Sequence, residues 1–141
     1  MPIRYLGFTE LMNATYARLK TNAYTSSYTT YNYVPSGTQA KPYITLGRLI
    51  GARSASFGNR DKAYEENVIS IDVWSDYPGD KECTEMMANV VKALTGSNLT
   101  IVGFGIPALL LYEYSEILVD VSESAVPVRH GVMRFRVTMA S

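Results

Sequence analysis

Hydrophobic residues near the start of the chain recur with helical spacing. From Phe8 to Leu19 they fall three or four positions apart, and Arg18 lies near the far end, where a cation interacts favourably with the helix dipole. This pattern predicts a helix from about residue 7 to 21. Residues 23–34 are rich in Tyr and Thr without a helical period, so they predict a strand whose tyrosines lie half buried or form an interface.

Apolar and polar residues then alternate strictly, which is the pattern of a half-buried strand. The aliphatic face carries Ile69, Ile71 and Val73, and the opposite face carries Ser70, Asp72, Trp74 and Asp76. Residues 42–47 predict an earlier strand, and the polar residues 51–67 predict a long connection between the two. We expect Trp74 to pack at the outer edge of the sheet.

A second helical pattern runs from Cys83 to Leu94, with Asp80 as a plausible N-cap and Gly96 as a stop. The strand that ends near Asp76 therefore turns directly into this helix. The corner is either a site with two carboxylates beside a tryptophan or the structural start of the helix. The pattern favours the structural interpretation.

The last third of the chain predicts three more strands, near residues 109–114, 116–122 and 130–139. The resulting order of elements predicts an α+β fold: a largely antiparallel sheet of about five to six strands with two main helices packed on one face. With 141 residues, of which 47% are hydrophobic, the chain is expected to form a single domain over residues 1–141.

Composition and charge argue against several classes of protein. The 13 basic and 13 acidic residues cancel, so no overall positive field holds a nucleic acid or an anionic membrane. The most apolar stretch, residues 101–111, contains a proline and is shorter than the roughly 20 residues of a membrane helix, so we expect it to be core or a surface that a partner covers. The start of the chain lacks the pattern of a signal peptide, and Cys83 is the only cysteine, so folding in a reducing cytoplasm is expected.

Candidate catalytic and metal-binding groups are few. His130 is the only histidine, which excludes a site with several histidines, and Cys83 lies on the apolar stripe of its helix, where a buried inert thiol is expected. Asp72 and Asp76 lie four residues apart on one strand, about 13 Å from each other, so they do not share an ion. We therefore expect no catalytic, metal-binding or cofactor-binding residue.

Three segments together, residues 42–47, 69–96 and 129–137, resemble the tail completion or tail terminator proteins of tailed phages, also called tail-to-head joining proteins. The features that carry the resemblance are the strand with a Trp-Ser corner at Trp74, the helix after it, and a terminal strand that begins at His130. The resemblance extends from about residue 8 to 139.

This resemblance implies a virion protein assembled in the host cytoplasm. It implies a homo-oligomeric ring, expected to be a hexamer, that caps the tail tube protein and docks the head-tail connector or stopper protein. DNA would pass through the channel without specific binding, and no cofactor or membrane would be involved. The alternatives are a head-side neck or connector (head completion) protein, a small enzyme or ligand-binding domain that uses the acidic corner and His130, and a nucleic-acid-binding protein with a local basic face.

Charge is segregated along the chain, which suggests how a ring closes. Residues 1–64 carry eight basic and two acidic side chains, residues 65–123 two and eleven, and residues 124–141 three basic ones. The segregation either neutralises charge within one subunit or gives a ring two complementary faces. For the second case, the candidate interface residues are Arg53, Arg60 and Lys62 on the basic side, and Glu113, Glu116 and Asp120 on the acidic side.

Overall fold

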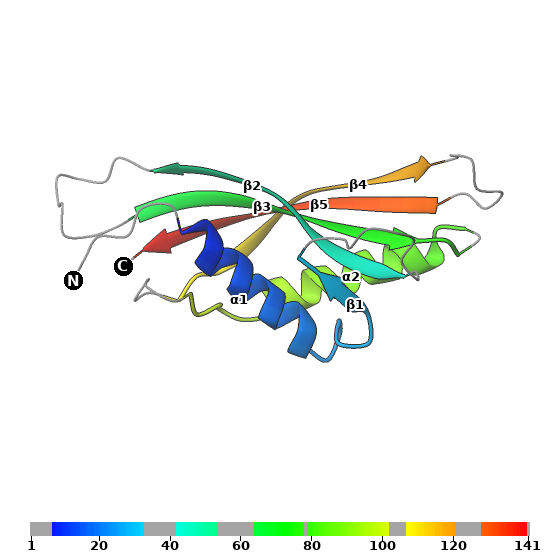
Figure 1. The fold of residues 1–141 in the computed structure, drawn as a ribbon, viewed down its shortest axis with the longest axis horizontal. Helices are drawn as coiled ribbons and strands as arrows, with labels where there is room; N and C mark the ends of the chain where they lie inside the picture. The colour runs from blue at the N-terminus through cyan, green and yellow to red at the C-terminus, as the bar shows by residue number, and fades with distance from the viewer. Residues whose placement is uncertain are drawn as a thin grey trace.

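Two helices and a five-stranded sheet make up the described part of the chain, residues 7–32, 42–53, 64–77, 79–101, 107–120 and 128–140 of a computed structural model (Figure 1). The elements are α1 (Phe8–Thr21), β1 (Thr29–Tyr31), β2 (Tyr43–Arg53), β3 (Tyr64–Ser75), α2 (Lys81–Thr95), β4 (Leu110–Asp120) and β5 (Val128–Ala140). The strand order is β1-β2-β3-β5-β4, and every pair is antiparallel except β1 with β2. The predicted α+β class is confirmed.

Helix α1 forms where the hydrophobic spacing predicts it. Its buried residues Leu11, Thr15 and Leu19 are spaced four apart, so they lie along one side of the helix. Arg18 fixes the end of α1 against the end of α2: its Nη1 donates to the carbonyl oxygen of Ala93 at 3.2 Å and its Nη2 to that of Asn98 at 2.9 Å.

The prediction of a strand over residues 23–34 is wrong for its first half. Residues 23–28 form turns, and the described strand β1 is only Thr29–Tyr31. Local hydrogen bonds explain the difference, because the Asn22 Oδ1 accepts from the Tyr24 amide at 2.9 Å and the Thr25 hydroxyl donates to the Leu19 carbonyl at 2.6 Å. Side chains that bond nearby backbone favour turns over strands.

Strands β2 and β3 form a hairpin that is longer than the sequence pattern predicts. Residues 51–53 and 65–67, which were expected in the long connection, pair with each other, with the Cα of Arg53 opposite that of Glu65. Glycine and glutamate are poor strand formers in isolation, but pairing across a hairpin overrides this preference. Only residues 54–63 of the predicted connection lie outside the described residues.

The corner between β3 and α2 is structural, as the pattern favoured. Gly79 has a φ of 109°, a conformation that glycine adopts without a steric penalty. Asp80 occupies the N-cap position, but its side chain makes no capping hydrogen bond; it binds the Arg129 Nε at 2.6 Å instead. The helix ends at Gly96, as predicted.

The two strands predicted near residues 109–114 and 116–122 are one strand, β4, as far as Asp120; residues 121 and 122 lie outside the described residues. Its pairing with β5 has an irregularity between Tyr112 and Tyr114, so an extra residue is accommodated without ending the strand. The final strand β5 follows the prediction, and its alternate residues are buried: Met133, Phe135, Val137 and Met139.

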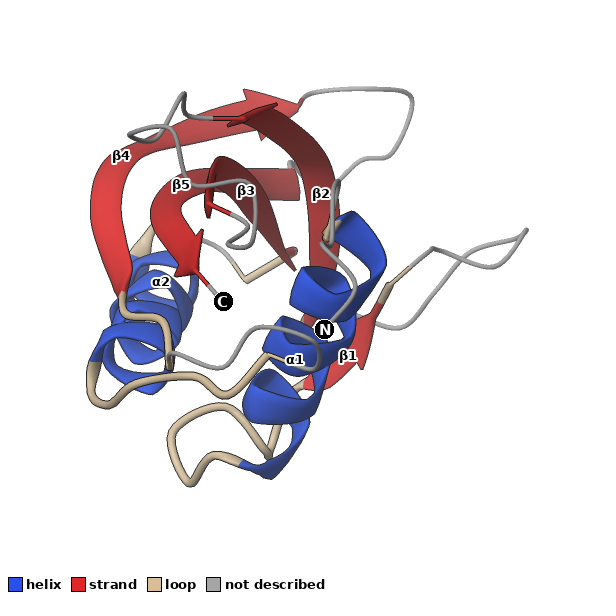
Figure 2. Ribbon diagram, turned by 90° about the vertical axis from the view of Figure 1, so that its left-hand side faces the viewer, coloured by secondary structure: helices blue, strands red, loops and turns tan. Residues whose placement is uncertain are grey.

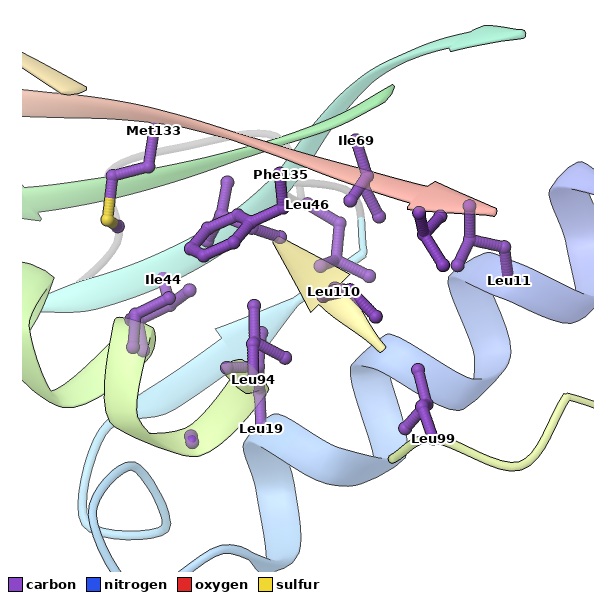
Figure 3. Packing of buried hydrophobic residues seen from close by; sticks show 14 of the residues in the cluster. Leu11, Leu19, Ile44, Leu46, Ile69, Leu94, Leu99, Leu110, Met133 and Phe135 are labelled. Carbon is purple, nitrogen blue, oxygen red and sulfur yellow. The ribbon is translucent and has the colours of Figure 1, made fainter. Parts of the chain in front are cut away.

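The core lies between the sheet and the helices. Helix α1 packs on β1 and β2, and α2 packs on β3, β4 and β5, so both helices cover the same face (Figure 2). Figure 3 shows Phe135 reaching from β5 into the centre of this layer, near Leu46, Leu94 and Leu110. The buried residues of β3 and β5 lie on this face, whereas the other face carries polar and aromatic residues together with exposed aliphatic residues such as Ile50 and Leu111.

Candidate functional site

Strand β4 forms one edge of the sheet and is unusually apolar for an exposed edge. Six of the nine large hydrophobic residues that are exposed in the described ranges lie on it or directly before it: Leu109, Leu111, Tyr112, Tyr114, Leu118 and Val119. Natural proteins usually protect edge strands with charge, short length or a covering segment, because the unpaired backbone groups can bind another chain. An 11-residue edge with this composition is therefore a candidate interaction surface.

The pairing register divides these side chains between two faces of the sheet. Leu111, Tyr114 and Leu118 lie opposite Arg136, Arg134 and His130, which belong to the face without helices. Tyr112, Ser115 and Ile117 lie opposite Phe135, Met133 and Gly131, on the helix side. A partner that covers the β4 edge would therefore meet apolar side chains on both faces.

A groove runs beside β4 on the helix side. It has a volume of about 480 Å³ and separates β4 from α2. Most of its lining is apolar and comes from Met87, Ala88, Val91, Tyr112, Ile117 and Met133. The helix α2 thus covers β5 more completely than it covers β4, which leaves room for side chains of a partner.

Two of the three acidic candidates on β4 have partners within the chain. Glu113 binds Arg136 through two hydrogen bonds, at 3.0 and 3.2 Å, and this carboxylate raises the pKa of the guanidinium. Glu116 accepts a hydrogen bond from the Tyr114 hydroxyl, which raises the pKa of that phenol because the bond holds its proton. The charge of Glu113 is thus neutralised within one subunit. This agrees with the first interpretation of the charge segregation, in which opposite charges pair inside the same chain.

The other candidate interface residues are only partly described. Arg53 is the last residue of β2, and Asp120 is the last of β4; their backbones are described but their side chains are not. Arg60 and Lys62 lie outside the described residues. The structure therefore does not bring Arg53 close to Glu113 or Glu116, since β2 and β4 are separated by β3 and β5.

The aspartates near the corner between β3 and α2 have different surroundings and form no common site. Asp72 lies beside His130, with 3.5 Å between Oδ1 and Nε2, whereas Asp80 pairs with Arg129 and Asp76 is exposed. Among the described residues, no group of three or more His, Cys, Asp and Glu side chains is arranged to hold a metal. No described helix is both long and apolar enough to cross a membrane.

Trp74 occupies a different place from the predicted one. It lies on β3, the middle strand of the sheet, and not at an outer edge. Its ring stacks on the His130 ring with centroids 3.8 Å apart and on the Tyr43 ring at 6.1 Å. This row of rings crosses β2, β3 and β5 on the face that the helices leave open, so a structural role accounts for the His130 ring.

Cys83 is buried in α2, as its place on the apolar stripe of the helix predicted. Burial raises its pKa, and Asp80 adds to this effect, so the reactive thiolate is disfavoured.

The sequence analysis anticipated the exposed apolar edge only in part. Residues 101–111 were interpreted as core or as a surface covered by a partner, and residues 109–114 only as a strand. The available signal was that apolar residues occupy consecutive positions in 109–112, so no choice of face can bury all of them.

Comparison with known proteins gives two findings. The model of the family described as tail completion protein gp17 matches residues 13–140. A chain in the structure of the virion of a native gene transfer agent (GTA) particle has a similar fold, with a TM-score of 0.81 and 21% identity over 98% of this chain and 100% of that chain. At that identity the structural similarity shows the fold alone. No curated protein sequence shows a significant match.

Proposed function

Because the chain belongs to the tail completion protein gp17 family, we propose that it is a structural protein of the phage tail that forms a ring, terminates the tail tube and joins the tail to the head. The observation that carries this proposal is the family match over residues 13–140. The similarity of almost the whole fold to a chain of the GTA virion supports it, since that chain also belongs to an assembled particle.

The proposed role requires contacts and no catalytic chemistry. The partners are other copies of the chain, in a ring of six, together with the tail tube protein on one side and the head-tail connector or stopper protein on the other. DNA passes through the ring without specific binding, and assembly takes place in the host cytoplasm. The apolar edge at β4 agrees with a protein whose function is to bind other subunits.

Particles that lack this protein test the proposed role. A tail terminator stops tube growth and supplies the docking surface for the head, so we expect overlong or unjoined tails in electron micrographs of particles made without it. Heads should remain filled with DNA, because closing the head does not depend on a tail protein. Normal tails beside leaking, empty heads would instead support the alternative function, a head-side neck or connector protein.

We further propose that the basic candidates Arg53, Arg60 and Lys62 on one subunit face Glu113, Glu116 and Asp120 on the next. Charges of this kind guide encounter and register more than they supply affinity. Reversal of Arg53 and Arg60 to Glu should slow ring formation by about tenfold at low salt.

Light scattering over time measures the rate of this assembly. A second reversal, of Glu113 and Glu116 to Lys, should partly restore it. Because Glu113 already binds Arg136 in its own subunit, the variant with Glu116→Lys alone should give most of the recovery. If the combined reversals assemble no faster than the first pair, the assignment of these charges is wrong.

A further inference from the structure

The sheet has two edges that are open in the described part of the chain. Strand β4 pairs with β5 on one side only. Strand β2 pairs with β3, and its other side is covered by β1 only from Tyr43 to Thr45. Among the described residues, the rest of β2 up to Arg53 has no strand beside it on that side. Each open edge presents backbone N–H and C=O groups that can pair with a further strand.

We infer that β4 of one subunit adds to the open part of β2 in the next, so that the sheets of neighbouring subunits become continuous. This inference rests on the proposed ring and names the surfaces that close it. A ring is built from contacts between two different surfaces of the same chain, and the two edges of one sheet meet that requirement.

Strand direction supports this pairing. Each of the neighbouring pairs β2–β3, β3–β5 and β5–β4 is antiparallel, so β4 and β2 run in opposite directions within one subunit. When neighbouring subunits are related by a rotation about a ring axis parallel to the strands, each strand keeps its direction from one subunit to the next. The β4 strand of one subunit would then meet β2 of its neighbour as an antiparallel pair, which continues the pattern of the sheet.

Charge selects β2 as the partner of β4. The acidic and basic residues of β4 are Glu113, Glu116 and Asp120, all negative, whereas those of β2 are Arg48 and Arg53, both positive. Two β4 edges would bring like charges together, but a β4 edge beside a β2 edge brings opposite charges together. The charge pattern thus favours the contact that builds a ring over a two-fold contact between identical edges.

Exposed apolar residues lie on both edges. Ile50 on β2 is 49% exposed and Leu111 on β4 is 56% exposed. Successive pairings place both residues in one row across the sheet, Ile50 beside Val68, Val68 beside Arg136 and Arg136 beside Leu111, and therefore on the face without helices. Joining the two edges would cover both side chains and bring a neighbour to the groove between β4 and α2.

Disulfide trapping tests the contact. Ile50→Cys is combined with Leu111→Cys, Tyr114→Cys or Leu118→Cys, one at a time, so that three registers are sampled. Within one subunit the two strands are separated by three strand spacings, about 14 Å, which is too far for a disulfide. The native Cys83 is buried and remains in place.

We expect at least one of these pairs to give a ladder of covalent multimers on non-reducing gels after mild oxidation. The matched control combines Ile50→Cys with Tyr77→Cys, an exposed position at the corner before α2, and should stop at dimers. Rings that form by light scattering while none of the three pairs cross-links would overturn this contact and leave the proposed ring intact. A chain that stays monomeric would contradict the ring and, with it, the contact.

A charged residue on the edge provides a second test that does not depend on register. Leu111→Lys should abolish ring formation, because it places a cation where the basic β2 edge must bind. Its thermal unfolding should match that of the native chain, since Leu111 is largely exposed. Tyr77→Lys is the control and should assemble normally. Normal assembly of the Leu111→Lys variant would contradict the inferred contact.

Discussion

Phe135→Ala is expected to lower the free energy of unfolding by about 3–5 kcal/mol. The side chain is fully buried in the middle of the core, and its loss leaves a cavity between β5 and the helices that the surrounding side chains cannot fill completely. It also removes the edge-to-face contact with the Tyr112 ring, whose centroid lies 6.0 Å away. Urea unfolding followed by circular dichroism measures the loss.

Thr138→Ala on the same strand is the matched control, because Thr138 is exposed and its truncation should change the free energy of unfolding by less than about 0.5 kcal/mol. A cost below about 1 kcal/mol for Phe135→Ala would mean that β5 does not face the helices as described.

Gly131→Ala is the second change with a large expected effect, a loss of about 1–3 kcal/mol in the free energy of unfolding. A Cβ at Gly131 would lie 2.6 Å from the Met87 Sδ and 2.7 Å from the Val73 Cγ2. Glycine is needed here because α2 approaches the sheet closely, and the branched Val73 cannot move aside easily.

A double-mutant cycle tests this explanation. Met87→Ala removes the sulfur nearest to the added methyl group. It should therefore lower the free energy of unfolding by less in the Gly131→Ala background than in the native chain. Chemical unfolding of the four proteins in the cycle gives the coupling. If the two costs simply add, the contact between residue 131 and Met87 is not the source of the loss.

The elements with a clear period could be predicted well from the sequence. Strand β3 shows why: Ile69, Ile71 and Val73 alternate with polar residues, and only one face of the sheet is covered by helices. Helix α2 was equally clear, because its stripe from Cys83 to Leu94 is buried along its length. In these segments the local pattern and the tertiary environment agree.

The segments that could not be predicted are those where particular hydrogen bonds or longer-range contacts decide the structure. Residues 23–28 form turns because the Asn22 side chain accepts from the Tyr24 amide and the Thr25 hydroxyl donates to the Leu19 carbonyl, although their composition suggests a strand. Residues 51–53 look like a loop but pair with residues across the hairpin. Trp74 alternates as expected, yet its place in the middle of the sheet depends on strand order, which periodicity does not contain.

The candidate interface was only partly accessible to sequence reasoning. The acidic candidates Glu113 and Glu116 lie on the exposed strand β4, which also carries the edge of the inferred contact. Composition could not show that Arg136 already neutralises Glu113, because that contact joins residues 23 positions apart. The apolar character of the β4 edge became visible only when the strand order placed it at the end of the sheet.

The ring is the central claim, and its mass tests it most directly. Size-exclusion chromatography with light scattering at high protein concentration should give a discrete species of about six times the 15.6 kDa of one chain. The same protein should be found in purified virions. A strictly monomeric species at every concentration, together with absence of the protein from purified virions, would contradict the account.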